Sequence, residues 1–509
     1  MRRILHSLLS PEIPFAAILL FGLLAMTARN AVDPDLWWHL RTGQWIVETH
    51  SIPHSDPFSF TRAGHAWISH EWLSEVIFFE LYKHGGAAAL IVFSAIVTTA
   101  GFMFLYLRCR PGGQKRHWAA AAIALGALAS APSWGVRPQM FTFTLASLLL
   151  LLIDRGEARP KFLLWIPPIF LLWLNLHGGF ALGPALLVAY GIGVLLESAA
   201  GNTPWPEARP ILLRIVLLLI ACLALVPLNP SGTHLYRYPL DTLRSSGMRS
   251  FISEWHSPDF HASLYRPLLL LWLILLTALA SSRVHLRGRV IVPLLLTAFA
   301  ALDAVRHIPI FVLLAIPVVV TALPVSPKSM LRRPHNSRRF RPAFGLFIVL
   351  LMALFAAVRW AILARDQNAR VAEVFPERAV AVLRGNSLSL NNSRQNQKLF
   401  IYYDWGGFAI WNLYPTYRVF VDGRADLYGD DLLHSLSTLI YLRTGWQDIL
   451  DRWQVDTVLV PSSCALAQAL LLDGHWRATF SDSQAIVFSR SPPAARNTDI
   501  SQTKPSPEQ

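Results

Sequence analysis

Two aspartates separated by one proline follow the first hydrophobic segment of the chain, in the sequence Asp33-Pro34-Asp35. A carboxylate beside a hydroxyl can accept its proton, and two carboxylates this close can hold a divalent cation such as Mg²⁺ or Mn²⁺. Asp35 also precedes an aromatic stretch that can open an amphipathic helix, so an N-cap role is the alternative. We predict catalytic or metal-binding roles for Asp33 and Asp35, with Trp38 and His39 as substrate contacts.

Further along the same loop lie His70 and Glu71, flanked by two tryptophans. A zinc site of the H-E-x-x-H type would need a second histidine where this chain has Ser74, so that motif is absent. We predict that His70 and Glu71 are additional catalytic residues. The alternative is that they form the polar side of an interfacial helix, with Trp67 and Trp72 at the level of the lipid headgroups.

Four basic side chains form a second group, each next to the end of an apolar segment: Arg137, His177, Arg306 and His307. Guanidinium and imidazolium groups bind phosphate through charge-assisted hydrogen bonds. Each residue alone is equally consistent with a side chain that only reaches the membrane surface. Together they predict a site that holds a phosphate or pyrophosphate at the membrane face.

A third group lies near the C-terminus, where Asp404 and Asp422 follow two predicted strands. Carboxylates at strand ends often line sites in α/β folds, although Asp-Gly is also an ordinary turn. We favour the turn for Asp422-Gly423. Arg424 and Asp426 remain candidates for binding an acceptor substrate or for docking one domain against another.

The composition shows what kind of molecule must position these residues. Of 509 residues, 53% are hydrophobic and only 15% are charged, which is typical of an integral membrane protein. In a soluble chain the net charge of +14 would suggest nucleic-acid binding, but in a membrane protein it indicates basic cytoplasmic loops. We therefore expect membrane lipids, and no nucleic acid, as partners.

Apolar runs near the roughly 20 residues that cross a bilayer predict about eleven transmembrane helices. They lie near residues 12–29, 86–107, 118–134, 138–153, 161–176, 179–197, 210–228, 266–281, 289–305, 307–323 and 343–364. The first run also resembles a signal peptide in part, but its length favours an uncleaved anchor. The three cysteines are not expected to form a disulfide, because the predicted topology separates Cys464 from the other two.

Basic residues predict the orientation, because Lys and Arg near span ends stay in the cytoplasm. Beginning with Arg2-Arg3, alternate loops are basic, most of all the loop of 324–342. The N-terminus is therefore expected inside and everything after about residue 365 outside. This topology places the loop of 30–85, the loop of 229–265 and the turns at the four basic residues on the outer side, where they can converge on one cleft.

Residues 365–490 are predicted to form a small α/β domain outside the membrane. Buried strands are expected at 398–403, 417–421, 457–460 and 485–489, and helices near 429–443, 446–453 and 465–472. The polar stretch 384–397 reads as a loop. The tail 491–509 is polar and rich in proline, which is typical of disorder. No internal repeat is evident.

This arrangement resembles the GT-C superfamily of membrane glycosyltransferases that use polyprenyl-phosphate sugars. The resemblance consists of a short cytoplasmic start, one span, an acidic outer loop with two interfacial helices, many further spans (residues 1–364) and an outer α/β domain. It implies that the catalytic carboxylate corresponds to Asp33 or Asp35. The frequent Asp-Glu pair is replaced here by Asp-Pro-Asp, and the second loop helix opens with Ser69-His70-Glu71-Trp72 instead of Pro-Pro or His-Pro.

The resemblance further implies an inverting transfer of a sugar from a polyprenyl-phosphate donor to an acceptor outside the bacterial inner membrane. Asp35 and Asp33 would supply the base, and the four basic residues would stabilise the leaving phosphate. Two alternatives remain open. A flippase or transporter of lipid-linked sugars would also have many spans, but it usually places ionisable groups near the bilayer midplane and shows repeated halves. A non-catalytic assembly protein would use the outer domain to bind an envelope partner.

Overall fold

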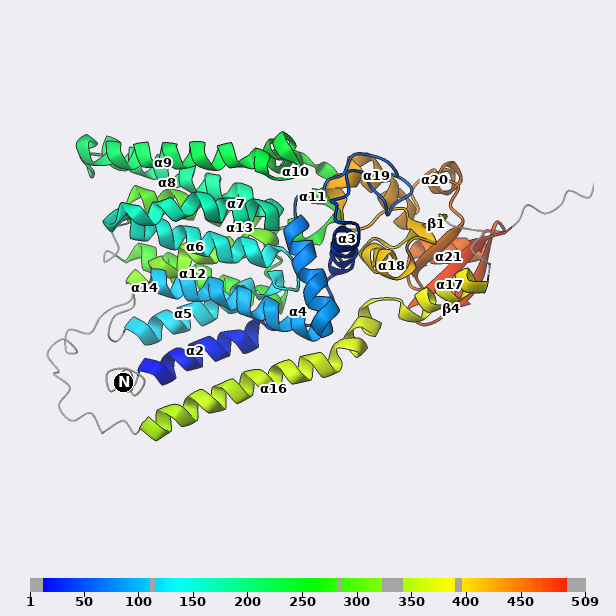
Figure 1. Cartoon of the computed structure of the whole chain (residues 1–509), viewed down its shortest axis with the longest axis horizontal. Helices are drawn as coiled ribbons and strands as arrows, with labels where there is room; N and C mark the ends of the chain where they lie inside the picture. Colours follow the sequence, from blue (N-terminus) through cyan, green and yellow to red (C-terminus); the bar gives the residue numbers. More distant parts are fainter. Residues whose placement is uncertain (1–11, 110–114, 282–285, 323–341, 390–395, 492–509) are drawn as a thin grey trace, which may run out of the picture.

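The computed structural model describes residues 12–109, 115–281, 286–322, 342–389 and 396–491. The predicted tail lies outside these ranges except for its first residue, and the predicted basic loop of 324–342 lies outside them except for its last. The described chain forms a bundle of helices with a small sheet domain at one end (Figure 1). All three cysteines are free.

Each predicted span has a corresponding helix. These helices are α2 (Glu12–Thr27), α4 (Trp72–Arg108), α5 (Lys115–Ser130), α6 (Gln139–Ala158), α7 (Ile166–Leu176), α8 (Leu182–Ala199), α9 (Trp205–Leu225), α12 (Arg266–Ala280), α13 (Gly288–Asp303), α14 (Ile308–Ala322) and α16 (Pro342–Val374). Within the described residues, seven helical segments are long and apolar enough to cross a membrane, and α2 and α7 belong to shorter apolar segments. The protein is an integral membrane protein, and the count of eleven spans stays a prediction.

Short helices connect the spans and gather mainly at the end of the bundle that faces the sheet domain (Figure 1). The α-helices among them are α3 (Leu36–Thr49), α10 (Tyr238–Arg244) and α11 (Ser246–Phe251). The 3₁₀ helices are η1 (Ala131–Ser133), η2 (Pro160–Trp165), η3 (Gly178–Ala181), η4 (Val226–Leu228), η5 (Gly232–Tyr236), η6 (Ser253–Trp255), η7 (Ser263–Tyr265) and η8 (Val305–His307).

Helix α4 consists of two helices joined at a kink. Gly86 has φ 59° and ψ −158°, a conformation that glycine adopts without a steric penalty and that interrupts the helix. The segment before the kink packs against α3 and carries charged residues such as Glu75 and Glu80. The predicted span 86–107 corresponds to the second segment. The predicted interfacial helix corresponds to the first, although His70 and Glu71 precede its first turn.

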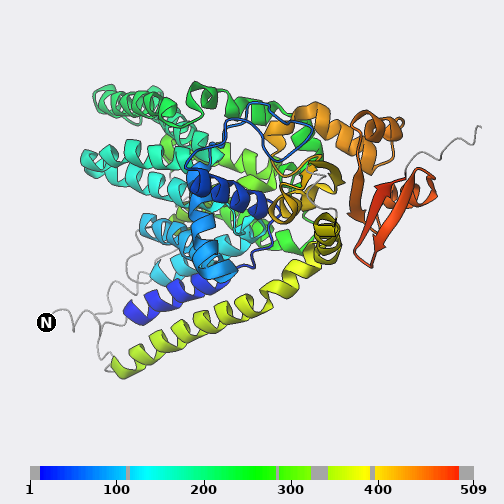
Figure 2. The same cartoon turned by 45° about the vertical axis from the view of Figure 1, so that its right-hand side comes forward.

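Helix α16 continues ten residues beyond the predicted span end at 364, to Val374, so the predicted domain boundary at 364–365 lies inside a continuous helix. Its polar extension is held at the end of α2: the side chain of Gln367 accepts a hydrogen bond from the backbone N–H of Ala31 at 2.9 Å and donates one to the Ala31 carbonyl at 2.8 Å. Figures 1 and 2 show α16 running along the edge of the bundle and leading into the sheet domain.

The C-terminal domain contains one five-stranded sheet with the order β2-β1-β3-β5-β4. The strands are β1 (Gln397–Ile401), β2 (Tyr417–Val419), β3 (Thr457–Pro461), β4 (Trp476–Ser481) and β5 (Ala485–Arg490). The helices are α17 (Glu377–Ser389), η9 (Tyr403–Trp405), α18 (Gly406–Leu413), α19 (Ala425–Ile440), α20 (Trp446–Arg452) and α21 (Ala465–Leu472). The pairs β1–β2 and β1–β3 are parallel, and β3–β5 and β4–β5 are antiparallel.

The predicted α/β class and the four predicted strands are confirmed. Strand β4 escaped prediction because it is an edge strand with mostly exposed, polar residues and no apolar run. The predicted loop at 384–397 is wrong for residues 384–389, which complete α17. Leu383 in that helix is buried against the core, and this tertiary packing favours a helix in a locally polar segment.

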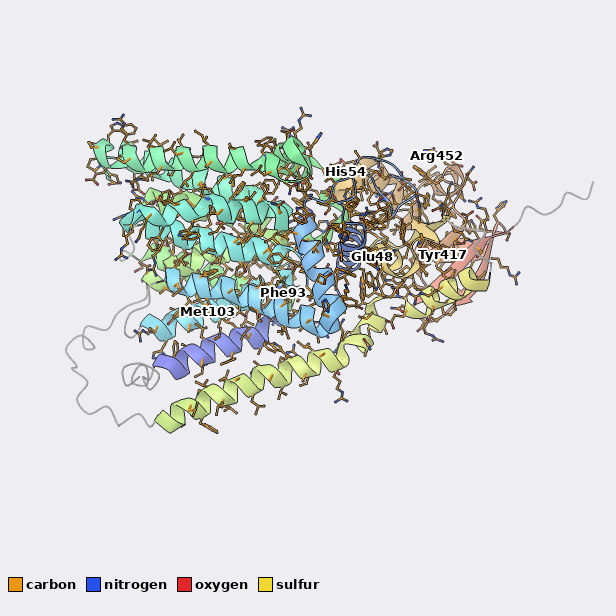
Figure 3. All side chains as sticks on the ribbon, in the orientation of Figure 1. Glu48, His54, Phe93, Met103, Tyr417 and Arg452 are labelled. Atoms are coloured by element: carbon orange, nitrogen blue, oxygen red, sulfur yellow. The ribbon has the colours of Figure 1, made fainter. Side chains whose placement is uncertain are left out.

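The first loop, residues 30–71, adds backbone pairing to the edge of the C-terminal sheet. The Phe60 N–H donates to the Val419 carbonyl at 3.1 Å, and the Val419 N–H donates to the Phe58 carbonyl at 3.2 Å. Figure 3 shows polar residues such as Glu48 and His54 at the domain end of the molecule, whereas Phe93 and Met103 lie along the bundle. The first loop therefore lies between the bundle and the domain.

Candidate functional site

A cavity of about 330 Å³ lies where the first loop, the end of the helical bundle and the C-terminal domain meet. Its walls come from segments far apart in sequence, including Asp33–His39, Ser69–Glu71, α10–η6 and residues 403–404 and 423–426. This confirms that the predicted loops and turns converge on one cleft. Eleven of the twelve predicted site residues line the cavity, and His307 does not. The eleven are Asp33, Asp35, Trp38, His39, His70, Glu71, Arg137, His177, Arg306, Arg424 and Asp426.

Asp35 precedes α3, but its side chain makes no capping hydrogen bond to the helix. Its Oδ1 instead accepts a hydrogen bond from Trp38 Nε1 at 3.1 Å, and its backbone N–H donates to Asp33 Oδ1 at 3.0 Å. Burial and the nearby charge of Asp33 raise the pKa of Asp35 to about 7. The contacts thus leave a carboxylate that can exchange a proton near neutral pH, and they do not support the N-cap alternative.

Gly423 approaches Asp35 from the C-terminal domain. A Cβ atom at Gly423 would lie 1.7 Å from Asp35 Oδ1, so only glycine leaves room for the carboxylate. The same approach brings the Trp38 indole nitrogen to 3.1 Å from that Cβ position. The predicted Asp422-Gly423 turn thus has a second role, because it forms the wall of the cavity against the carboxylate.

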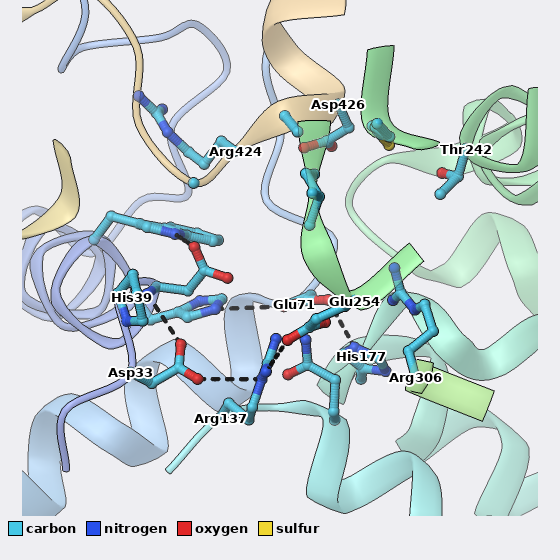
Figure 4. A pocket seen from close by; sticks show the side chains of 18 of the residues that line it. Asp33, His39, Glu71, Arg137, His177, Thr242, Glu254, Arg306, Arg424 and Asp426 are labelled. Carbon is cyan, nitrogen blue, oxygen red and sulfur yellow. Dashed lines mark hydrogen bonds and ion pairs between the residues drawn. The ribbon is translucent and has the colours of Figure 1, made fainter. Parts of the chain in front are cut away.

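Arg137 links the two acidic walls of the cavity. Its Nε lies 3.4 Å from Asp33 Oδ2, and its Nη1 donates a hydrogen bond to Glu254 Oε1 in η6 (Figure 4). All three side chains are at most about a third exposed, so the ion pairs are only partly screened by water. Arg137 is therefore held in place before any ligand enters.

The predicted Mg²⁺ or Mn²⁺ site does not fit this geometry. The Arg137 guanidinium faces Asp33, and Asp35 Oδ1 is occupied by the Trp38 indole N–H. Across the part of the chain that the structure describes, no group of three His, Cys, Asp or Glu side chains is placed to hold a metal ion. A bound divalent cation would need several oxygen ligands in place of these contacts.

Arg306 is the second arginine of the cavity. Its guanidinium carbon lies 4.4 Å from the ring centre of Trp255, which is a cation–π arrangement. His307, the next residue, does not line the cavity, and its Nδ1 lies 3.2 Å from the Ala300 carbonyl oxygen. The structure therefore separates this predicted pair: Arg306 faces the cavity, and His307 packs against α13.

Glu71 lies among three histidines. Its carboxylate oxygens are 3.8 Å from His39 Nε2, 3.5 Å from His70 Nε2 and 3.7 Å from His177 Nε2, and it accepts a hydrogen bond from the Gly178 N–H at 3.0 Å. Burial opposes ionisation, but His177, His70 and His39 lower the pKa of Glu71 below its ordinary range. Glu71, at the end of the first loop, thus binds polar groups of the helical bundle through His177 and Gly178.

His177 is neutral near pH 7. Burial, together with the nearby charge of Arg306, lowers the pKa of His177 to about 4. Its Nδ1 accepts a hydrogen bond from the Gly179 N–H at 3.0 Å and lies 2.7 Å from Thr142 Oγ1. His177 can therefore orient a ligand by hydrogen bonding, but it does not supply the positive charge that we expected of it.

Arg424 joins the first loop to the C-terminal domain. It is 1% exposed, its Nη1 donates to Asp56 Oδ1 at 2.7 Å and its Nη2 donates to Asp422 Oδ2 at 2.7 Å. Its guanidinium also lies 4.5 Å from the ring centre of Trp67. These contacts favour the docking alternative for Arg424. Asp426, in the first turn of α19, lines the cavity (Figure 4).

Sequence reasoning missed several residues of the cavity walls. Glu254 and Tyr238 lie in the loop of 229–265, which was predicted to share a membrane face with the other site residues, but no motif marks them. Tyr403 was missed because it was predicted to end a buried strand, whereas β1 ends at Ile401 and Tyr403 begins η9. Asp404 was noted at the end of that predicted strand, where a site residue is expected in an α/β fold, but it was not assigned a role.

No family model and no curated protein matches the sequence. Solved structures do match. The archaeal oligosaccharyltransferase AglB from Archaeoglobus fulgidus, in complex with an inhibitory peptide and a dolichol-phosphate, is similar over 94% of this chain and 74% of that chain, with 12% identity and a TM-score of 0.54. The arabinofuranosyltransferase AftD from Mycobacteria is similar over 94% of this chain and 40% of that chain, with 13% identity and a TM-score of 0.53. At such identities the likeness shows a shared fold.

Proposed function

We propose that this chain, which has the GT-C fold of membrane glycosyltransferases, transfers a sugar from a polyprenyl-phosphate donor to an acceptor with inversion at the anomeric carbon. One observation carries this proposal. Asp35, a carboxylate with a pKa of about 7, lines the same cavity as Arg137 and Arg306, at the end of an apolar helical bundle. A base and a phosphate-binding charge are the two groups that the reaction needs.

In the proposed reaction, a hydroxyl or amine of the acceptor attacks the anomeric carbon of the donor sugar. The bond from that carbon to the phosphate oxygen breaks, and the phosphate leaves with the electron pair. Asp35 accepts the proton of the nucleophile, and Arg306 with Arg137 stabilises the charge of the leaving phosphate. No covalent intermediate with the protein forms, which is consistent with inversion.

The donor lipid is proposed on two grounds. The AglB structure was obtained with a dolichol-phosphate, and its fold is shared by this chain. The cavity of this chain adjoins apolar helices that are long enough to cross a membrane, so a lipid tail can remain in the bilayer while its phosphate reaches the arginines.

The location of the ionisable residues favours a transferase over a transporter. Among the described cavity residues, those with charged side chains lie in loops, in short helices or at helix ends. Transporters typically place such groups near the bilayer midplane, on broken helices. The charge pattern of the loops supports the proposed orientation, with a cytoplasmic N-terminus and an extracytoplasmic C-terminal domain. We place the protein in the bacterial inner membrane as part of the same proposal.

The test uses a deletion strain complemented with the wild type or with Asp35→Asn. Lipid-linked sugars and surface glycans are measured by mass spectrometry. We expect the deletion to accumulate one lipid-linked sugar and to lose that sugar from its acceptor, with recovery by the wild type only. Asp35→Asn keeps the side-chain size but cannot act as a base. Normal glycans in the strain that expresses a well-inserted Asp35→Asn variant would refute the proposal.

A further inference from the structure

Two further cavities, of about 230 and 290 Å³, lie at the end of the bundle opposite to the Asp35 cavity. Helix α6 shows the separation: Gln139 at its start lines the Asp35 cavity, and Glu157 near its end lines both of the other cavities. At 1.5 Å per residue these two positions are about 27 Å apart. The pair also shares Arg287 and Arg289, so we treat it as one region, the far cavity.

A buried ion pair between Arg289 and Glu197 lies beside the far cavity. Arg289 is 7% exposed and binds Glu197 through Nε at 3.0 Å and Nη2 at 2.6 Å, while Glu157 accepts a hydrogen bond from the Tyr190 hydroxyl at 2.7 Å. A Cβ atom at Gly193 would lie 2.4 Å from the Gly288 carbonyl oxygen, so α8 and α13 are in close contact there. The charge of Arg289 is thus already compensated within the protein.

Arg214 is different, because it lies within an apolar span. It is on α9, on the same face as the cavity-lining residues Ile211, Ile215 and Leu218, which follow the helical spacing. It lies about 6 Å inside the apolar run that begins near residue 210, at 1.5 Å per residue, and its side chain is exposed. An arginine this close to a span end can reach the level of the lipid headgroups, where a phosphate can compensate its charge.

Among the described residues, no carboxylate lies within ion-pair distance of Arg214. Arg287, at the same cavity, has only a long ion pair: its Nη1 lies 3.9 Å from Glu157 Oε2, and its side chain is 67% exposed. Around Arg214, the neighbours Leu213 and Leu217 are more than half exposed, as expected for a helix face in contact with lipid tails. The far cavity therefore combines an apolar wall with two arginines whose charge is not fully compensated.

We propose that the far cavity binds the phosphate of an anionic phospholipid from the leaflet opposite to the Asp35 cavity. Arg214 and Arg287 contact the phosphate, and the acyl chains lie along the apolar face of α9. Basic pockets between transmembrane helices are suited to such headgroups. The proposal is independent of the sugar-transfer proposal, because it uses neither the residues nor the membrane face of the Asp35 cavity.

The test measures phospholipid retained by the purified full-length protein. The protein is reconstituted in nanodiscs of equal parts phosphatidylglycerol and phosphatidylcholine, released into detergent and analysed by native mass spectrometry. We expect the wild type to retain phosphatidylglycerol in preference to phosphatidylcholine. The double variant Arg214→Gln, Arg287→Gln should retain at least about tenfold less phosphatidylglycerol than the wild type. Each charge-assisted hydrogen bond contributes roughly a factor of ten or more to the binding affinity.

The matched control is the double variant Arg159→Gln, Arg209→Gln. It removes the same charge from exposed positions at the same end of the bundle that do not line the far cavity. Equal loss in both double variants would show that surface charge alone holds the lipid, and it would overturn the proposal. Equal retention of phosphatidylcholine and phosphatidylglycerol by the wild type would also overturn it. The single variant Arg214→Gln provides the same readout if the double variant does not elute as a single species.

Discussion

Asp35 shows how neighbouring residues determine the acid–base chemistry of one carboxyl. Burial, followed by the negative charge of Asp33, favours the protonated form of Asp35, while Arg137, His39 and the Trp38 indole favour the ionised form. The outcome is a pKa of about 7, far above that of an exposed aspartate. A base with this pKa can take the proton from the hydroxyl or amine of the acceptor substrate near neutral pH and then release that proton to water.

This pKa leads to a prediction for the pH dependence of transfer. The base is active only when ionised, so the rate should increase from pH 6 to pH 8 with a midpoint near 7. The measurement is kcat/KM for the purified protein with its lipid-linked donor across that range. Unfolding midpoints at each pH serve as the control for stability. A rate that is constant between pH 5.5 and 8 would contradict the role of Asp35 as the base.

Arg306 leads to a second prediction, because its contact with Trp255 leaves the guanidinium facing the cavity. Arg306→Gln should weaken donor binding by about tenfold to a hundredfold, since a charge-assisted hydrogen bond is worth roughly 1.5 to 3 kcal/mol. The measurement is donor affinity by isothermal titration. His307→Gln is the matched control, because His307 lies outside the cavity. Equal affinities of the wild type and Arg306→Gln would assign this arginine to membrane anchoring.

The space at Gly423 leads to a third prediction. Gly423→Ala would place a methyl group on Asp35 Oδ1, so the turn or the carboxylate must move. We expect at least a tenfold loss of transfer and a loss of stability of about 1 to 3 kcal/mol from overpacking. Gly474→Ala is the control, because no atom lies within 4 Å of its Cβ position. Full activity in Gly423→Ala would mean that the carboxylate acts from another position.

At the scale of the elements, the first loop and the C-terminal sheet form one structural unit. The loop pairs with strand β2 through Phe58 and Phe60, and Asp56 in the loop shares the guanidinium of Arg424 with Asp422. Asp35 and Gly423 belong to the two sides of this joint. Folding of the domain against the loop is therefore required to complete the cavity wall.

The joint predicts that Arg424→Met destabilises the protein more than it affects donor binding. Removing one partner of a buried ion pair costs about 3 to 5 kcal/mol, because Asp56 and Asp422 are left without a counter-charge. A lower unfolding midpoint and faster proteolysis of the C-terminal domain are the readouts. Arg443→Met at an exposed position is the control. Unchanged stability with weaker substrate binding would instead make Arg424 a substrate contact.

At the scale of the whole molecule, the apolar bundle and the polar domain separate two environments. The Asp35 cavity lies at the boundary between them, where a lipid phosphate and a water-soluble acceptor can meet. The far cavity lies at the other end of the bundle. The loop charges predict which of these ends faces the cytoplasm.

The predicted orientation can be tested by cysteine labelling in a variant without the native cysteines. Leu472→Cys lies at the end of α21, where the side chain is 90% exposed, and Arg287→Cys lies at the opposite end of the molecule, where it is 67% exposed. A membrane-impermeant maleimide should label Leu472→Cys in intact cells and Arg287→Cys only after permeabilisation. The reverse pattern would place the C-terminal domain in the cytoplasm.

The sequence alone determined the features that depend on local composition. Apolar runs located all the helices of the bundle, because a segment in lipid must satisfy its backbone hydrogen bonds within itself. Strands β1, β2, β3 and β5 were recognisable as buried apolar runs, and the residues Asp33, Asp35, Arg137 and Arg306 stood out as ionisable groups beside apolar spans. The edge strand β4 lacked such a pattern.

Only the tertiary structure decided what each of these groups does. Asp35 owes its raised pKa to burial and to Asp33, and His177 is neutral because it is buried beside Arg306. Arg424 became a docking residue because Asp56, more than 360 positions away in the chain, meets it. Electrostatic interactions depend on distance in space and on exposure to water, and neither quantity can be read from residue types and spacing along the chain.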